Sequence, residues 1–225
     1  MSLKKITNNS WRNTMFTPIE QKINSTFVHE KEKEAFDYFK TIIEKMIING
    51  HEAHKTIPGY DECKPEIECF KIFEGINIPV HGYADLKGKI IIEDKCKFPR
   101  KGRVKKDGTR SWVTNKLPEN GVDPMHLTQT DFYYYATGLP IYVCYINEKE
   151  FKVYHKDNCE DLQPEKIMSR LESFRQKCLV RQNLLKISND PKVIKDYIQP
   201  DFSHYFWKND LDPTYLEKAK KFWSS

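Results

Sequence analysis

The segment HGYADLKGKIIIEDKCK, residues 81–97, carries the pattern from which the fold is predicted. Gly88 sits in a short polar LKGK segment, which predicts a tight turn between two strands of a hairpin. The returning strand begins with three isoleucines and runs directly into Glu93, Asp94 and Lys95. Side chains alternate along a strand, so Glu93 and Lys95 are predicted to share one face and Asp94 the other. The strand therefore ends in a charged cluster instead of ordinary turn residues.

A further acid, Asp85, lies on the first strand of this predicted hairpin. A tight turn at Lys87-Gly88 would pair Asp85 with Ile90 and leave it about three residues, roughly 10 Å, from Glu93. Two carboxylates that share a metal must lie within about 5 Å, so we expect a bulge, bend or splayed strand end there. Asp94 requires a hydrogen-bond or charge partner on its own face; otherwise it belongs to the site and the register differs.

The rest of the chain alternates helical and strand patterns. Apolar residues at spacings of three and four predict a helix over 30–49, which Gly50 is placed to end or break. Asp123 and Pro124 read as the cap and first residue of a helix reaching Ala136. The other predicted elements are strands over 67–74, 76–85, 89–97, 139–146 and 151–155, a helix over 164–187, and two short helices over 190–198 and 212–223. This order predicts an α/β sandwich with a central mixed β-sheet flanked by helices, in one domain spanning 1–225.

Two terminal segments and one internal loop stand apart from this core. Residues 1–28 lack periodicity and are predicted to form an N-terminal arm, and 188–225 a helical C-terminal extension. Residues 98–123 are predicted to form an irregular basic loop, and a loop of this length in a compact domain is usually functional or disordered. From Lys95 to Lys116 nine Lys or Arg accompany one acid, a local charge of +8 in a chain whose net charge is +5. A localised basic excess indicates an anionic partner such as nucleic acid, or a solvated loop in a Lys-rich chain.

The charged strand end has the composition of a phosphodiesterase site. Clustered carboxylates suit a hard cation, Mg²⁺ or Mn²⁺, and a neighbouring lysine can orient water or stabilise developing negative charge. Phosphodiester hydrolysis requires this combination, because the cation activates water and offsets charge in the transition state. A surface cluster of salt bridges on a hairpin is the alternative interpretation of Asp85, Glu93 and Lys95.

The arrangement Asp85…Glu93-Asp94-Lys95 resembles the signature of the PD-(D/E)XK nuclease superfamily, an Asp followed by (D/E)-x-K. Downstream, Gln129 and Tyr133 form a Q-x-x-x-Y element similar to that of the RecB-type, lambda-exonuclease-like branch. They lie one helical turn apart and so share a face. Tyr133 alone would otherwise be read as a core aromatic.

The segment GHEAH, Gly50 to His54, is similar to the G-x-x-h-H element of the same branch. The resemblance implies that His54 is a third metal ligand, with His51 as a near alternative. It covers roughly residues 35–155, and it departs from the family in the short Asp85–Glu93 hairpin and in the acid at Asp94.

The resemblance implies a restriction-endonuclease-like α/β sandwich and a Mg²⁺- or Mn²⁺-dependent deoxyribonuclease. His54, Asp85, Glu93 and the backbone carbonyl of Asp94 would hold the metal, and Lys95 would orient the attacking water. Gln129 and Tyr133 would position the site or the nearby phosphate. The residues expected to grip DNA are Lys97, Arg100, Lys101, Arg103, Lys105, Lys106 and Arg110, with Trp112 stacking on an unpaired base. If this loop passes over the site, it favours single strands or duplex ends, and hence an exonuclease of recombination, repair or phage replication.

Three other functions stay open at this point: a restriction- or repair-type endonuclease, a non-catalytic nucleic-acid-binding protein with the same fold, and a structural interaction domain. No apolar run approaches a transmembrane helix and no secretory leader is visible, so we expect a cytoplasmic protein. The Lys-, Ile- and Asn-rich composition and small size are typical of a phage or mobile element in a bacterial cytoplasm. The six cysteines form no C-x-x-C pair and are expected to be reduced.

Overall fold

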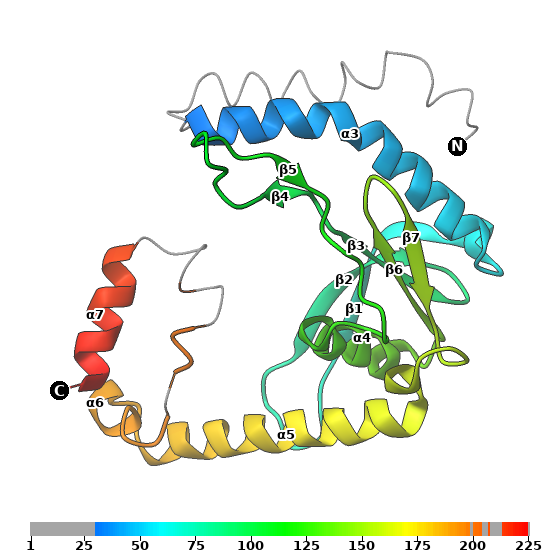
Figure 1. Cartoon of the computed structure of the whole chain (residues 1–225). Helices are drawn as coiled ribbons and strands as arrows, with labels where there is room; N and C mark the ends of the chain where they lie inside the picture. The colour runs from blue at the N-terminus through cyan, green and yellow to red at the C-terminus, as the bar shows by residue number, and fades with distance from the viewer. Residues whose placement is uncertain (1–29, 199, 204–206, 208–212, 225) are drawn as a thin grey trace.

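The computed structural model describes residues 30–198, 200–203, 207 and 213–224 (Figure 1). The predicted N-terminal arm over 1–28 lies outside these residues. None of the helices in the described ranges combines the length and hydrophobicity needed to cross a bilayer. All six cysteines are free thiols.

A five-stranded sheet forms the centre of the molecule, with the strand order β1-β2-β3-β6-β7. Strands β3 and β6 run parallel, and the other neighbouring pairs are antiparallel, so the sheet is mixed. The parallel pair is joined by a crossover that contains helix α4. The strands are β1 (Lys64–Lys71), β2 (Val80–Lys87), β3 (Ile91–Cys96), β6 (Ile141–Ile146) and β7 (Phe151–Tyr154).

Helices cover both faces of this sheet (Figure 1). The covering helices are α3 (Glu30–Lys55), α4 (Pro124–Thr137) and α5 (Pro164–Ile187), whereas α6 (Pro191–Ile194) and α7 (Pro213–Ser224) lie beyond the C-terminal end of α5, away from the sheet. One core joins α4 and α5 to the face of β3 that carries Ile91, and a second joins α3 to the face that carries Ile92. The predicted α/β sandwich with a mixed sheet is thus confirmed, and so is the predicted alternation along β3.

The hairpin between β2 and β3 corrects the predicted register. Leu86 pairs with Ile92 and Lys87 with Ile91, so the turn lies at Gly88–Ile90, beyond the predicted position. The Gly88 amide donates to the Ile90 carbonyl at 2.9 Å and closes this turn. If the same register is continued by one residue, Asp85 lies opposite Glu93. The predicted three-residue displacement between these two carboxylates is therefore absent. The prediction was wrong because a two-residue turn was assumed where the chain uses a longer one.

Two other sequence predictions need correction. Helix α3 continues through Gly50 to Lys55, and a Cβ added at Gly50 would lie 3.3 Å from the Ile146 side chain. Close packing against β6 therefore explains this glycine better than helix termination. The loop over 98–123 is also not wholly irregular, because β4 (Arg100–Lys101) and β5 (Trp112–Val113) pair within it.

Helices α4 and α5 are joined by a buried ion pair, Arg170 with Asp131. The guanidinium donates to both carboxylate oxygens at 2.7 Å, and Asp131 is only 2% exposed. Burial raises the pKa of Asp131, and Arg170 acts in the opposite direction. We expect Arg170→Met to lower the free energy of unfolding by about 3 kcal/mol, because it leaves this carboxylate buried without a partner.

The loss of stability in Arg170→Met should shrink as the pH falls. A carboxyl with a raised folded-state pKa contributes stability at low pH that is lost as the pH rises through that pKa. Urea unfolding at several pH values measures the difference from wild type, and Asp131→Asn/Arg170→Met should recover most of it. A loss that is constant between pH 4 and pH 8 would contradict an electrostatic origin.

Candidate active site

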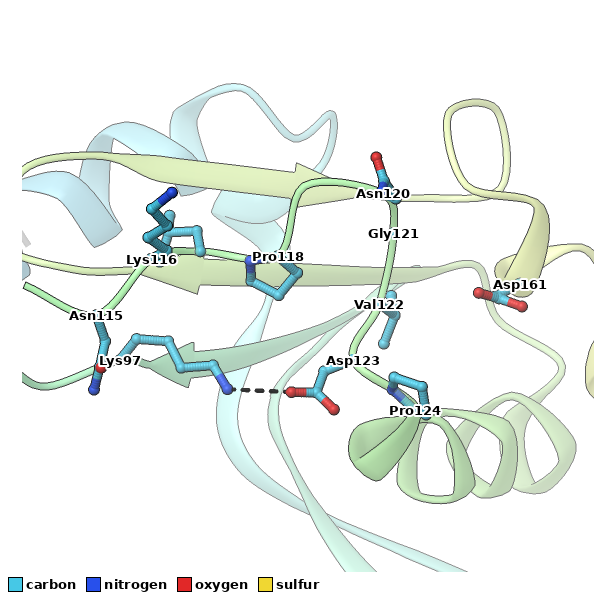
Figure 2. A pocket seen from close by; sticks show the side chains of 11 residues that line it. Lys97, Asn115, Lys116, Pro118, Asn120, Gly121, Val122, Asp123, Pro124 and Asp161 are labelled. Carbon is cyan, nitrogen blue, oxygen red and sulfur yellow. Dashed lines mark hydrogen bonds and ion pairs between the residues drawn. The ribbon is translucent and has the colours of Figure 1, made fainter.

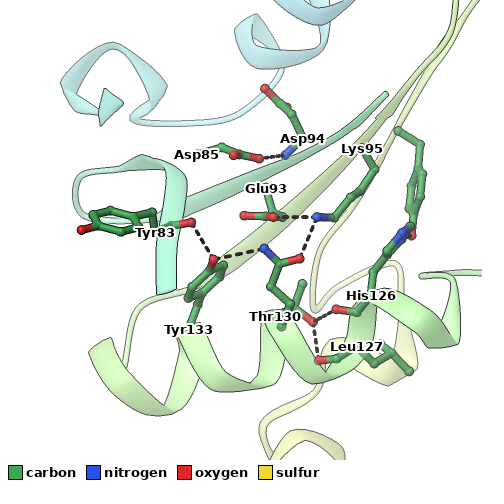
Figure 3. A network of polar contacts seen from close by, with 11 residues as sticks. Tyr83, Asp85, Glu93, Asp94, Lys95, His126, Leu127, Thr130 and Tyr133 are labelled. Carbon is green, nitrogen blue, oxygen red and sulfur yellow. Dashed lines mark hydrogen bonds and ion pairs between the residues drawn. The ribbon is translucent and has the colours of Figure 1, made fainter. Parts of the chain in front are cut away.

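The charged end of β3 forms a buried ion pair. Glu93 is 1% exposed, and the Lys95 Nζ donates to its Oε1 at 2.6 Å (Figure 3). Both side chains point to the face covered by α4 and α5, as the strand alternation predicts. A carboxylate is almost never buried in this way without a specific partner or ligand.

Helix α4 presents Gln129 and Tyr133 to this pair. The cap and first residue of the helix are Asp123 and Pro124, as predicted. The Gln129 Oε1 accepts from Lys95 at 2.8 Å, and its Nε2 donates to the Tyr133 hydroxyl at 3.1 Å. The Tyr133 hydroxyl donates in turn to the Tyr83 carbonyl at 2.6 Å. This chain anchors Lys95 through α4 to strand β2, as Figure 3 shows.

Tyr133 is both a core aromatic and a member of this polar network. It is 2% exposed, and burial raises its pKa to about 12. Its hydroxyl therefore stays protonated at neutral pH and can keep donating to the Tyr83 carbonyl. The two interpretations of Tyr133 offered by the sequence are compatible.

Asp85 reaches the same strand end from β2. Its Oδ2 accepts from the Asp94 backbone amide at 2.8 Å, where β2 and β3 cease to pair (Figure 3). Burial raises the pKa of Asp85, and the hydrogen bond from this amide opposes the shift. The negative charge of Asp85 also raises the pKa of Glu93, so the two carboxyls interact.

The second oxygen of Glu93 is the most informative atom of the site. Oε2 is buried and has no hydrogen-bond partner among the described residues. The pKa of Glu93 is raised, with burial as the largest cause, and the Lys95 ammonium acts in the opposite direction. A buried lone pair without a partner costs free energy, and a bound cation would satisfy it.

His54 lies on the other face of β3 and does not join Glu93. Its Nε2 lies 2.9 Å and 3.0 Å from the two carboxylate oxygens of Asp94. Within the described ranges, the ligand atoms of His54, Asp94 and Cys144 form the group that falls within 4.8 Å. The predicted convergence of His54, Asp85 and Glu93 on one ion is therefore not present. The physical reason is that α3 covers the Asp94 face, so a histidine at its end meets Asp94.

The His54–Asp94 pair instead answers the predicted need of Asp94 for a partner on its own face. Cys144 lies beside this pair, and burial raises the pKa of its thiol. His51, the alternative histidine, lies near the same helix end, with its Nδ1 3.5 Å from the Tyr60 hydroxyl. Neither histidine contributes a ligand beside Glu93.

The donor set beside Glu93 fits a hard cation. Asp85 and Glu93 supply carboxylate oxygens, the backbone of Asp94 follows Glu93 in the strand, and the orphaned Glu93 Oε2 provides an unfilled acceptor. Oxygen donors of this kind are the ligands preferred by Mg²⁺ and Mn²⁺. No nitrogen or sulfur donor is needed for such a site.

The basic loop, residues 98–123, has one part packed against α3 and an exposed tip. Trp112 stacks on Tyr38 of α3, with centroids 4.6 Å apart, and the Lys101 ammonium lies 5.0 Å from the Trp112 ring centroid. Lys101 also pairs with Glu34 of α3. At least one face of the Trp112 ring is therefore used in packing against α3, which weakens its predicted role in base stacking. The residues that project as exposed cations are Arg100, Arg103, Lys105, Lys106 and Arg110.

Lys97 is directed away from this tip, toward the start of α4. Its Nζ lies 3.5 Å from the Asp123 Oδ2 and 5.6 Å from the Tyr145 ring centroid. It lines a cavity of about 740 Å³ that Asp123 and Lys116 also border (Figure 2). Lys97 is thus closer to the Lys95 end of β3 than to the hairpin tip.

Two groups near the strand end, the Tyr83 carbonyl and Cys144, carry no sequence signal that could have predicted their positions. The Tyr83 carbonyl is a backbone group, and any residue type at that position would offer it. Cys144 lies inside a uniformly apolar strand and reads as core. Their proximity to Tyr133 and Asp94 depends on strand register, which only the folded chain defines.

The fold and site together define an α/β sandwich with a buried acidic and lysine-containing centre at a strand end. No family model and no curated protein matches the chain. Among solved structures, it is similar to one described as "Crystal structure of SSO0001", with 18% identity over 76% of this chain and 78% of that chain, and a TM-score of 0.32. A likeness of this extent carries no argument about function.

Proposed function

We propose that the protein is a metal-dependent nuclease that hydrolyses phosphodiester bonds in DNA. One observation carries the proposal: the buried Glu93 carboxylate, with an orphaned oxygen, lies against Lys95 and beside Asp85. A surface salt-bridge cluster would be hydrated and would not need a lysine anchored by Gln129. The resemblance to PD-(D/E)XK nucleases supports the same conclusion.

Asp85, Glu93 and the backbone carbonyl of Asp94 would hold Mg²⁺ or Mn²⁺. When bound, the cation supplies Lewis-acid activation of water and offsets negative charge on the phosphate. Lys95 donates a hydrogen bond that orients the attacking water and stabilises charge on the non-bridging oxygens. The water oxygen bonds to phosphorus and loses one proton to solvent, the bond from phosphorus to one sugar oxygen breaks, and that oxygen takes up a proton from solvent.

Gln129, Tyr133 and His54 act as positioning residues. Gln129 restrains the Lys95 ammonium, and Tyr133 ties Gln129 to strand β2. His54 holds the Asp94 side chain on the opposite face, which steadies the backbone whose carbonyl would face the metal. Placing reactive groups within a fraction of an ångström has a large effect on rate.

The exposed cations of the β4–β5 hairpin would bind the phosphate backbone. The hairpin projects beside α3, and its tip lies away from the packed core (Figure 1). We favour an exonuclease acting on single strands or duplex ends, in recombination, repair or phage replication. A restriction- or repair-type endonuclease is the second candidate, because the same chemistry serves both.

Purified protein tests the activity directly. With Mg²⁺ or Mn²⁺, end-labelled linear DNA should be degraded, and chelation of the metal should stop the reaction. Closed circular single-stranded and supercoiled DNA should survive if the enzyme is an exonuclease and be cut if it is an endonuclease. Intact linear and single-stranded DNA with both metals would refute the nuclease proposal. DNA binding that persists without metal and without cleavage would favour a non-catalytic binding protein.

Replacing the tip cations tests the hairpin separately. Arg103→Ala/Lys105→Ala/Lys106→Ala/Arg110→Ala should weaken DNA binding for all sequences. It should also reduce the slope of log affinity against log salt by about one for each phosphate that the variant no longer neutralises. The fold should be unaffected, because all four side chains are exposed. Fluorescence anisotropy over a range of salt concentrations measures the slope, and an unchanged slope would show that the hairpin does not touch DNA.

A further inference from the structure

A second cavity lies on the same side of the sheet as Glu93, between β2, α4 and α5. Its volume is about 460 Å³, within the range of small-molecule binding pockets. Aromatic and aliphatic side chains form most of its walls: Phe73, Phe132, Leu171 and Phe174. Thr128, Gln129 and His81 add a few polar groups. Apolar walls with a small number of placed polar groups are typical of a ligand site.

This cavity adjoins the proposed active site through shared residues. Gln129 and Tyr133 line it, and both belong to the network that anchors Lys95. The Gln129 Oε1 lies 2.8 Å from the Lys95 ammonium. The Gln129 side chain therefore stands between the cavity and the positive charge of Lys95. A ligand with an anionic group at Lys95 could thus place an attached apolar ring in the cavity.

Gly82 helps to maintain this shape. A Cβ at this position would lie 3.1 Å from the Tyr133 Cε1 and 3.2 Å from its hydroxyl oxygen. A side chain at this position would require Tyr133, which hydrogen-bonds Gln129, to move by a few tenths of an ångström. The cavity wall at Gly82 and Tyr133 and the hydrogen bonds from Lys95 to the Tyr83 carbonyl therefore depend on the same close approach between β2 and α4.

We propose that this cavity is a nucleobase subsite, which holds the base of the nucleotide whose phosphate lies at Lys95. The inference rests on the proposed nuclease function and specifies how its substrate is held. Aromatic walls accept the π-face of any base, which suits an enzyme that acts on many sequences. The Gln129 side chain has one N–H and one oxygen lone pair beyond its two hydrogen bonds, so it can also contact the edge of a base.

Binding of nucleotides measures the subsite without any cleavage. The probes are deoxyadenosine 5′- and 3′-monophosphate, each compared with the corresponding base-free deoxyribose phosphate by isothermal titration calorimetry with Mg²⁺. We expect at least one base-bearing ligand to bind about tenfold more tightly than its base-free counterpart, as stacking contributions imply. Equal affinities in wild type, or no binding of either nucleotide, would overturn the proposal.

A matched pair of variants locates the effect. Thr128 is exposed and lines the cavity, so Thr128→Trp should fold normally and fill the cavity opening. Ser173→Trp is the control, because it places the same ring on an exposed part of α5 outside the cavity. Thr128→Trp should abolish the tenfold preference and Ser173→Trp should keep it. If Ser173→Trp lost the tenfold preference while Thr128→Trp kept it, or if both variants kept it, the nucleobase would bind outside this cavity.

Cleavage of a strand with an abasic terminal residue separates this inference from the nuclease proposal. If wild type cuts ordinary and abasic ends at equal rates, the subsite is refuted and the nuclease stands. A base-dependent nucleotide affinity without any DNA cleavage would support the subsite and refute the nuclease.

Discussion

Lys95→Met should lower the rate of DNA cleavage by about 10² to 10³, the usual cost of removing one preorganised charge from a transition state. The methionine preserves most of the side-chain volume but cannot orient water or stabilise the phosphate. It also leaves Glu93 buried without the ammonium that lies 2.6 Å away in wild type. We therefore expect a lower melting temperature as well as the loss of activity.

A double variant separates these two effects. Glu93→Gln/Lys95→Met removes both charges and should recover stability while staying inactive. Lys89→Met is the control on the same hairpin, since Lys89 is an exposed lysine paired with Glu62 at 2.8 Å. It should cleave DNA as wild type does. Cleavage by Lys95→Met at more than about a tenth of the wild-type rate would contradict the proposed role.

Glu93→Gln should abolish stabilisation by divalent cations. A ligand that binds the native state at one hundred times its dissociation constant adds about 2.7 kcal/mol of stability. In a chain of this length that amounts to a rise in melting temperature of about 5–10 °C for wild type with Mg²⁺ or Mn²⁺. The neutral amide cannot bind a hard cation in the same way, so the variant should show no comparable rise and no cleavage.

Glu148 offers a matched control for this experiment. It is the other residue in the described ranges with a buried, unpartnered carboxylate oxygen, and Thr114 donates to its Oε1. Glu148→Gln makes the same chemical change away from Asp85 and Lys95, and it should keep both the metal response and the activity. If Glu148→Gln lost the response and Glu93→Gln kept it, the proposed site would be wrong.

The pH dependence of the metal-free proteins follows from the raised pKa of Glu93. A carboxyl whose folded-state pKa is raised contributes stability at low pH that is lost as the pH rises through that pKa. Wild type should therefore lose stability relative to Glu93→Gln as the pH rises from about 4, the unperturbed range of a Glu carboxyl, through the raised pKa of Glu93. Melting curves over this range without metal measure the difference, and a change of the opposite sign would contradict the shift.

Much of the fold was predictable because its signals are local. The Asp123-Pro124 start of α4, the isoleucine run of β3 and the length of α5 follow from capping chemistry and periodicity. The alternation that separates Glu93 from Asp94 is equally local, since it depends only on the pleat of one strand. Each of these predictions was confirmed.

Contacts between distant segments were not predictable from the sequence. Gly50 looked like a helix end, but its proximity to Ile146 of β6 shows that it serves packing. Trp112 looked available for a base, but it stacks on Tyr38 of α3. Neither partner can be inferred from local sequence, because the choice depends on which side of the sheet each helix covers.

Strand alternation puts Glu93 and Lys95 on one face of β3, and helical spacing puts Gln129 and Tyr133 on one face of α4, because both patterns are properties of single elements. The folded structure places Asp85 opposite Glu93, because this register depends on the length of one turn. It also decided that His54 pairs with Asp94 across the sheet from Glu93. The side of a sheet that a helix covers is set by the packing of the whole core, and no short motif encodes it.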